Sequence, residues 1–151
     1  MQVEDIMTRA VFTCDAHADL VAVARVMWDH DCGYVPVVDE QEQLAGVVTD
    51  RDVAMAAYIH GRTLAEIPVA EIMSRPVHSC QPSASVELAH QIMRNAEIRR
   101  LPVIDQDGKL VGLVTWSDLL GAAQREASAS AAAALTRQAL ETLEVTSAQK
   151  R

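Results

Sequence analysis

Two short motifs of this chain combine residue types that could bind a sugar phosphate. They are GVVTDRD, residues 46–52, and GLVTWSD, residues 112–118, and each follows a predicted strand with a threonine and places an aspartate three residues later. An aspartate carboxylate only accepts hydrogen bonds, which suits it to the two hydroxyls of a vicinal diol such as ribose. The helix that begins after each threonine is expected to present free N–H groups to a phosphate. The polar residues are Thr49 and Asp52 in the first motif and Thr115 and Asp118 in the second.

Helix capping is the alternative explanation of each motif. Threonine is common just before the first turn of a helix, and an acidic residue three positions later is an ordinary capping partner. Capping does not account for the strand glycines Gly46 and Gly112, which we expect to let a ligand approach the backbone closely. It does not account for Pro36 and Pro102 either, which predict strand edges whose backbone is left open. The repetition of the whole pattern therefore favours binding.

The duplication extends far beyond the motif. Displacing the sequence by 66 positions aligns residues 3–57 with residues 69–123 without a gap, and 18 of the 55 pairs are identical. One copy in each half predicts a pseudo-twofold pair, because an open array needs about three or more repeats. The expected organisation is a first domain over 1–60, a connector over 61–68, a second domain over 69–123 and a tail over 124–151.

Each repeat has the pattern of a small α/β unit. Apolar residues recur at helical spacing over 17–31 and 83–97, which predicts two amphipathic helices. The runs AVFTC and PVHSC before these helices, and two Val- and Leu-rich runs after each of them, predict strands. Asp107-Gly108 is typical of a hairpin turn. Because the paired strands are almost continuously apolar, both faces of each sheet are expected to be covered.

The tail changes composition and becomes rich in alanine, which favours a helix. Leu135, Ala139 and Leu143, with Leu140, give this helix a thin apolar stripe. The stripe fits either a partly frayed, solvated helix or a helix that packs on a second subunit. The sequence does not separate the two.

Bulk composition excludes several classes of protein. The formal net charge of −8 has the wrong sign for a nucleic-acid partner. No run of the roughly 20 apolar residues that a membrane helix needs is present, so no membrane association is expected. Three cysteines without a CxxC pair predict reduced, buried thiols and a cytoplasmic protein.

Catalytic signatures are absent from the sequence. The five histidines are scattered, and the chain contains no HExxH, GxSxG or glycine-rich phosphate loop. His30, Asp31 and Cys32 bring metal-ligand types together, but their aligned partners are Ala96, Glu97 and Ile98, so polar surface is expected there rather than a metal site. No enzyme and no required cofactor are predicted.

Taken together, the repeated motifs resemble those of a tandem pair of cystathionine-β-synthase (CBS) domains, also called a Bateman module. The resemblance covers about residues 3–123 and depends on three paired stretches. These are DIMTRAVFTC with EIMSRPVHSC, GYVPVVD with RRLPVID, and GVVTDRD with GLVTWSD.

The resemblance implies an α/β fold of two pseudo-twofold-related β-α-β-β-α units packed through their sheets, plus the C-terminal helical tail. It also implies two clefts that bind adenosine-containing ligands: AMP, ADP or ATP, or S-adenosylmethionine or NAD. Such modules regulate rather than catalyse, so the chain is expected to be a stand-alone, energy-sensing module that signals to an unidentified effector protein. A homodimer is implied as well.

Carried onto this sequence, the family's ligand contacts fall on nineteen positions. Asp52 and Asp118 would take the ribose hydroxyls, with Thr49 and Thr115 near the ribose or phosphate. The full set is Thr13, Ala18, Tyr34, Val35, Pro36, Val47, Thr49, Arg51, Asp52, Ser79, Ala84, Arg99, Arg100, Leu101, Pro102, Leu113, Thr115, Ser117 and Asp118.

The resemblance also pairs the two repeats across each cleft, Tyr34 with Asp118 and Arg100 with Asp52. Arg51, Arg99 and Arg100 would then gather at one cleft, which would prefer ligands with more phosphate. Trp116 replaces Asp50 in the second copy and would either stack on a ligand or cover a subunit contact. The alternative function is a structural homodimerisation module whose clefts are empty.

Overall fold

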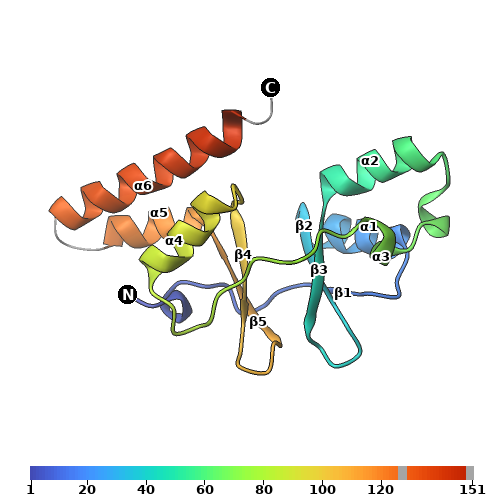
Figure 1. Cartoon of the computed structure of the whole chain (residues 1–151), viewed down its shortest axis with the longest axis horizontal. Helices are drawn as coiled ribbons and strands as arrows, with labels where there is room; N and C mark the ends of the chain where they lie inside the picture. Colours follow the sequence, from blue (N-terminus) through green and yellow to red (C-terminus); the bar gives the residue numbers. More distant parts are fainter. Residues whose placement is uncertain (126–128, 149–151) are drawn as a thin grey trace. The chain divides into compact units, whose positions relative to one another are not determined.

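A computed structural model describes residues 1–125 and 129–148 (Figure 1). The chain forms two compact units, each with a small sheet and helices. The first-repeat unit contains Phe12–Val77 and the turn Asp107–Leu110. The second-repeat unit contains Met1–Val11, His78–Gln106 and the described residues from Val111 onward. The α/β class is therefore confirmed.

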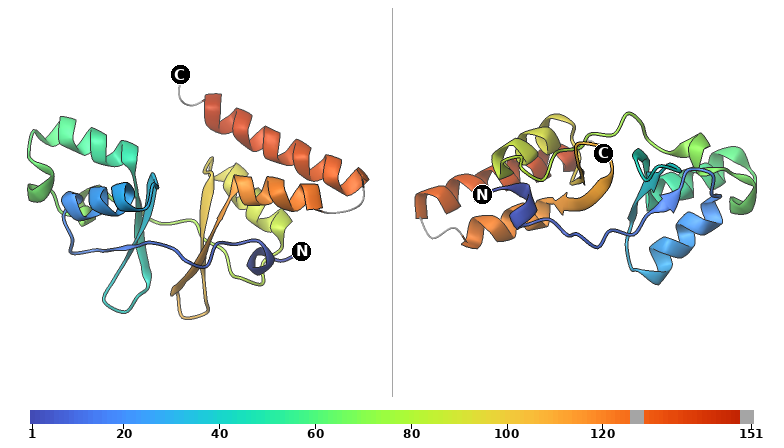
Figure 2. Two further views of the ribbon diagram at one scale, coloured as in Figure 1. Left: turned by 180° about the vertical axis from the view of Figure 1, so that it is seen from behind. Right: turned by 90° about the horizontal axis from the view of Figure 1, so that it is seen from below.

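The first-repeat unit is built on a three-stranded sheet. Its strands have the order β1-β2-β3, with β1 parallel and β3 antiparallel to β2. All the helices of this unit lie on one side of the sheet (Figures 1 and 2). The elements are β1 (Cys14–Asp15), α1 (Leu20–Asp29), β2 (Tyr34–Val38), β3 (Leu44–Thr49), α2 (Asp50–His60), the 3-10 turn η2 (Leu64–Glu66) and α3 (Val69–Ile72).

The second-repeat unit repeats this plan on a two-stranded sheet, β4-β5. A single parallel bridge between Cys80 and Val103 takes the place of β1. The elements are the 3-10 turn η1 (Val3–Asp5), α4 (Val86–Asn95), β4 (Arg100–Ile104), β5 (Leu110–Thr115), α5 (Trp116–Arg125) and α6 (Ala129–Ala148). In the described parts of the chain, no helix is both long enough and apolar enough to span a bilayer.

Capping side chains determine where the predicted amphipathic helices begin. Asp19 accepts a hydrogen bond from Ala22 N (3.0 Å), and the aligned Ser85 accepts one from Leu88 N (3.1 Å). These caps start α1 and α4 three residues later than the periodicity predicted. The predicted hairpin turn is confirmed, since Gly108 takes a φ of 80°.

The opening segment of each repeat packs in the unit of the other repeat. Thr8 bridges to Leu113 in the second-repeat unit, and its aligned partner Ser74 bridges to Val47 in the first-repeat unit. The same exchange links Gln2 with Ser85 and Pro68 with Asp19. Compact units and sequence repeats therefore differ at their edges.

A methionine covers the motif glycine in each unit. A Cβ built on Gly46 would lie 2.5 Å from Met73 Sδ and 2.8 Å from its Cγ. A Cβ on Gly112 would lie 2.6 Å from Met7 Sδ and 3.2 Å from the carbonyl oxygen of Thr8. The expectation that these glycines make room for a ligand is wrong, because the chain's own methionines fill the space.

Pro36 does not lie on an edge strand, contrary to the prediction. It belongs to β2, the central strand, where its register partner on β3 is Val47. The other neighbour, β1, pairs only with Val37 and Val38. Of the predicted strand AVFTC, only Cys14 lies in β1. Because β1 begins to pair with β2 just beyond the proline, the sheet tolerates the missing N–H of Pro36.

The tail helix α6 packs on its own chain, along α5 and α4 (Figures 1 and 2). The Nε2 atom of His90 lies 2.8 Å from Gln138 O and 2.7 Å from Thr142 Oγ1. Ala139 and Thr142 are buried in this contact. Neither expectation for the tail, a solvated helix or a helix on a second subunit, matches this placement.

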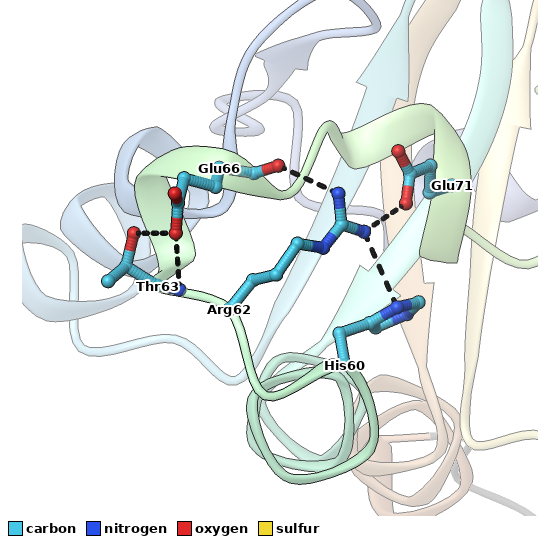
Figure 3. Close-up of polar contacts among 5 residues, drawn as sticks. All are labelled: His60, Arg62, Thr63, Glu66 and Glu71. Atoms are coloured by element: carbon cyan, nitrogen blue, oxygen red, sulfur yellow. Dashed lines mark hydrogen bonds and ion pairs between the residues drawn. The ribbon is translucent and has the colours of Figure 1, made fainter.

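Polar contacts of Arg62 order the connector between α2 and α3 (Figure 3). Its guanidinium donates to Glu71 Oε2 (2.6 Å) and to Glu66 O (3.1 Å). Glu66 in turn accepts from Thr63 N and Oγ1 at 2.9 and 2.8 Å, which lowers the pKa of its carboxyl group. These exposed contacts orient the connector and add little to stability.

Substituting Gly46 by alanine should destabilise the protein by about 1–3 kcal/mol, because the new Cβ overlaps Met73 close to its own Cβ and a simple rotation does not relieve it. Gly121→Ala is the matched control: outside its own helix backbone, no atom of the described residues lies within 4 Å of a Cβ there, and alanine favours the helix by up to about 1 kcal/mol. Urea unfolding of the parent and of both variants measures the change in the free energy of unfolding. Equal stability of Gly46→Ala and the parent would contradict the methionine contact.

Candidate functional site

The first motif forms a closed capping box at the start of α2. Thr49 N and Thr49 Oγ1 both donate to Asp52 Oδ2, at 2.8 and 2.7 Å, and Asp52 N donates back to Thr49 Oγ1 at 3.2 Å. Both side chains are half-buried. The capping interpretation of this motif is therefore confirmed.

The second motif repeats this geometry within about 0.1 Å. Thr115 N and Thr115 Oγ1 each donate to Asp118 Oδ2 at 2.7 Å, and Asp118 N donates to Thr115 Oγ1 at 3.3 Å. Thr115 and Asp118 are also half-buried. The two repeats thus present the same arrangement of hydroxyl and carboxylate.

Capping occupies only one oxygen of each carboxylate. All the hydrogen bonds to Asp52 and Asp118 within residues 1–125 and 129–148 go to Oδ2. The second oxygen, Oδ1, accepts none from that part of the chain. Since a half-buried carboxylate is held rigidly by its capping bonds, Oδ1 is a pre-oriented acceptor for a hydroxyl donor. Capping and diol binding are therefore compatible.

The N–H groups at the start of α2 are not free, which corrects the expectation of a phosphate site there. Asp50 N donates to Gly33 O (3.2 Å), Arg51 N to Asp50 Oδ1 (2.7 Å) and Asp52 N to Thr49 Oγ1. The exposed Asp50 carboxylate also adds negative charge at this turn. An anion is disfavoured at the first turn of α2.

The start of α5 differs in one N–H group. Trp116 N donates to Arg99 O (3.1 Å) and Asp118 N to Thr115 Oγ1, whereas Ser117 N has no hydrogen-bond acceptor in the described residues. No acidic side chain replaces Asp50 there, because the aligned residue is Trp116. The first turn of α5 can therefore offer an N–H group to an anion.

Positions 33 and 50 both differ from their repeat partners, and the two differing residues lie next to each other. Gly33 lies against Asp50, since a Cβ on Gly33 would be 2.7 Å from Asp50 Oδ2. The aligned Arg99 and Trp116 are joined by the backbone hydrogen bond described above. The glycine makes room for the aspartate that closes the α2 turn. The sequence alignment contained this signal, because positions 33 and 50 change together, but their contact was not predicted.

The nineteen predicted ligand contacts divide between the two units according to the repeat that they belong to. Tyr34 faces Thr49 across β2 and β3, which brings the motif threonine next to the predicted adenine wall. Val35 and Leu101 are fully buried in the cores, so only their backbone is available to a ligand. The first-repeat unit holds Thr13, Ala18, Tyr34, Val35, Pro36, Val47, Thr49, Arg51 and Asp52, and the second-repeat unit holds Ser79, Ala84, Arg99, Arg100, Leu101, Pro102, Leu113, Thr115, Ser117 and Asp118. The pairing of Tyr34 with Asp118 and of Arg100 with Asp52 stays a prediction.

Residues of metal-ligand type do not form a cluster. Within the described ranges, no three His, Cys, Asp or Glu side chains gather around a common point. His30 stacks on Phe12 with ring centroids 3.4 Å apart, and Cys32 Sγ lies 3.9 Å from Val26 O. These two side chains of the 30–32 segment therefore have partners other than a metal.

The two aligned cysteines are buried in the cores of their units. Burial raises the pKa of the Cys14 thiol to about 11, with a smaller contribution from Asp15, and burial raises the pKa of the Cys80 thiol to about 11. Both are therefore neutral thiols near pH 7 and unsuited to nucleophilic chemistry.

Comparison with known proteins places the repeats in a family. A sequence profile described as the CBS domain matches residues 3–58 and 69–125. The CBS domain-containing protein YhcV of Bacillus subtilis is 41% identical over 134 residues, which are 89% of this chain and 92% of that protein.

Solved structures of similar chains contain different ligands. The CBS domain pair of MJ0100, in complex with 5'-methylthioadenosine and S-adenosyl-L-methionine, has 28% identity and a TM-score of 0.69 over 78% of this chain and 91% of that one. CBSX2 in complex with AMP has 25% identity and a TM-score of 0.72 over 82% and 96%. Hypoxic Response Protein I, with two coordinated zinc ions, has 30% identity and a TM-score of 0.72 over 78% and 95%.

Protein stability should fall between about pH 9 and pH 11. Because the raised pKa values of Cys14 and Cys80 keep the folded thiols protonated while the unfolded chain ionises, their stabilising contribution is complete below about pH 9 and is lost as pH rises toward 11. Urea unfolding of the parent and of Cys14→Ala/Cys80→Ala at pH 7.5, 9 and 10.5 tests this. The double variant should show the flatter pH dependence, and parallel curves would refute the assignment.

Proposed function

The chain belongs to the CBS domain family, and we propose that it is a regulatory CBS pair that binds an adenosine-containing ligand through its Thr/Asp motifs. CBS-pair proteins are generally regulatory rather than catalytic, and the proposed role is to signal ligand binding to a partner protein. The nucleotide is AMP, ADP or ATP in the first place, with S-adenosylmethionine or NAD as further candidates.

One observation carries the proposal. Each motif aspartate is fixed by hydrogen bonds to Oδ2 and keeps Oδ1 available, next to a half-buried threonine at a strand end. A ribose presents two adjacent hydroxyls, and each charge-assisted hydrogen bond to a carboxylate contributes about 1.5–3 kcal/mol when shielded from water. The ligands in the MJ0100 and CBSX2 structures support this chemistry, since all of them contain adenosine.

The two motifs are not equivalent toward phosphate. The available N–H group of Ser117 and the absence of an aspartate at position 116 favour an anionic ligand at the second motif. At the first motif, Asp50 and the satisfied N–H groups of α2 leave only side-chain cations such as Arg51 to meet a phosphate. We therefore expect Asp118 to contribute more than Asp52 to the affinity for a nucleotide. This is the opposite of the preference that the resemblance assigned to the cleft of Arg51, Arg99 and Arg100.

A structural dimerisation module is the second candidate, and the fold gives a reason for it. Capping accounts for Thr49 and Asp52, and the methionine contact accounts for Gly46, so the motif is stable without a ligand. Ligand binding has to be measured to separate the two.

Isothermal titration calorimetry with AMP, ATP, S-adenosylmethionine and NAD tests the proposal. We expect micromolar binding of at least one ligand by the parent, and a loss of at least about tenfold in affinity in Asp118→Asn. Asn keeps the shape and one capping acceptor but replaces the carboxylate. Asp50→Asn is the matched control, because it also removes one negative charge from the first turn of a helix, here α2. It should leave the affinity for the nucleotide unchanged or improve it.

Thermal unfolding provides an independent readout. A ligand at about 100 times its dissociation constant that binds only the folded protein should add near 2.7 kcal/mol to the free energy of unfolding. At the same ligand concentration, a tenfold weaker affinity in Asp118→Asn should reduce this gain to about 1.4 kcal/mol, and the full gain should persist in Asp50→Asn. No shift and no binding heat with any of the four ligands would favour the dimerisation module.

A further inference from the structure

The carboxylate of Asp50 lies at the first turn of α2 as an anion that the chain itself supplies. Of the N–H groups of residues 50–52, Gly33 O and Thr49 Oγ1 accept two, and Asp50 Oδ1 accepts the third, from Arg51 N at 2.7 Å. The N–H group equivalent to that of Arg51 is Ser117 N on α5, which has no acceptor in the described residues. Asp50 therefore satisfies the N–H group that an external anion could bind at α5.

Gly33 provides the space for this carboxylate. A Cβ on Gly33 would lie 2.7 Å from Asp50 Oδ2 and 3.2 Å from its Cγ, so any side chain at position 33 would push the carboxylate away. The residue after Gly33 is Tyr34, which faces Thr49 across β2 and β3. The Asp50 carboxylate thus lies beside the strand end that carries the predicted adenine wall and the motif threonine.

The two repeats also differ in charge around their motifs. Positions 33, 34 and 49–52 carry one positive and two negative side chains, which sum to −1. The aligned positions 99, 100 and 115–118 carry two positive side chains and one negative, which sum to +1. A phosphate monoester carries about −1.5 to −2 near pH 7. It is therefore repelled by the side chains of the first set and attracted by those of the second.

A ribose bound to Asp52 would bring its 5' group close to Asp50. In the proposed function, Asp52 Oδ1 accepts the ribose hydroxyls, and both aspartates belong to the first turn of α2. Ribose is a single five-membered ring, so its 5' group stays close to the hydroxyls. A negatively charged 5' group would then lie near the Asp50 carboxylate, and like charges at short range repel each other even near a protein surface. A neutral or cationic 5' group does not suffer this repulsion.

We propose that the first motif binds adenosine derivatives whose 5' group has no negative charge, such as a thioether or a sulfonium, and that Asp50 excludes nucleotides there. The second motif lacks this carboxylate and binds the nucleotide. The inference rests on the proposed function, because it assigns a ligand class to each of the two Thr/Asp motifs. Asp50 and Gly33 are the residues that determine this specificity.

Isothermal titration calorimetry of Asp118→Asn with 5'-methylthioadenosine, S-adenosylmethionine and AMP tests the proposal. These ligands share the adenosine group and differ in the charge of the 5' group. We expect the neutral and cationic ligands to bind at least about tenfold more tightly than AMP. Binding that is lost when Asp52→Asn is added to Asp118→Asn is binding at the first motif.

Two substitutions of Asp50 in the Asp118→Asn chain separate the charge from the hydrogen bond. Asp50→Asn removes the charge and keeps an oxygen for Arg51 N, whereas Asp50→Ala also exposes that N–H group. The preference over AMP should fall to within about threefold in the first and further in the second. Glu87→Gln is the matched control, because it removes an exposed negative charge from the first turn of α4 and should leave the preference unchanged.

A titration of the chain with Asp118 intact gives a second readout that does not depend on how Asp118→Asn folds. There, Asp50→Asn should add a second AMP binding event per chain. Thermal unfolding without ligand checks that the variants fold. If none of the ligands binds the parent, the proposed function itself is wrong. If the parent binds but Asp118→Asn binds none of them or binds AMP as tightly as 5'-methylthioadenosine, or if Asp50→Asn changes neither readout, only the assignment of ligand classes is overturned.

Discussion

The contact between a methionine and a strand glycine connects the sequence duplication to the architecture. Met73 lies against Gly46 and Met7 against Gly112, and any side chain on either glycine would displace the methionine. Each methionine comes from the opening segment of one repeat and lies in the unit of the other. The two repeats are thus joined by exchanged segments as well as by the connector. The strands that carry these glycines end at the Thr/Asp motifs, so the same contact supports the candidate site.

In the proposed function, one residue pair in each motif would serve both stability and binding. Threonine and aspartate close a capping box in each unit, which fixes the carboxylate at the helix start and satisfies backbone N–H groups. One carboxylate oxygen is used in this way, and the other stays available. A binding group that is also a structural cap is rigid before the ligand arrives, and little conformational entropy is lost when it binds.

Substitutions between the repeats have changed two parts of the units: the helix start after the Thr/Asp motif and the surface of the outer helices. In the first-repeat unit, Gly33 allows Asp50 to close the start of α2, while the second-repeat unit has Arg99 and Trp116 at these positions. On the outer helices, His90 and Arg94 anchor α6, while the aligned Ala24 and Trp28 leave an apolar surface. The symmetry of the sequence repeats is therefore lost at the first turns of α2 and α5 and in the exposure of the outer helices.

Sequence alone was sufficient to predict the duplication, the α/β class, the amphipathic helices and the helix start after each motif threonine, because these follow from local periodicity and capping. It also predicted that Asp52 and Asp118 are candidate ligand-binding carboxylates. The tertiary structure decided what fills the space over Gly46, which strand lies beside Pro36 and where α6 packs. Those outcomes depend on contacts between residues far apart in the chain, such as Met7 with Gly112 and His90 with Thr142, which no local pattern specifies.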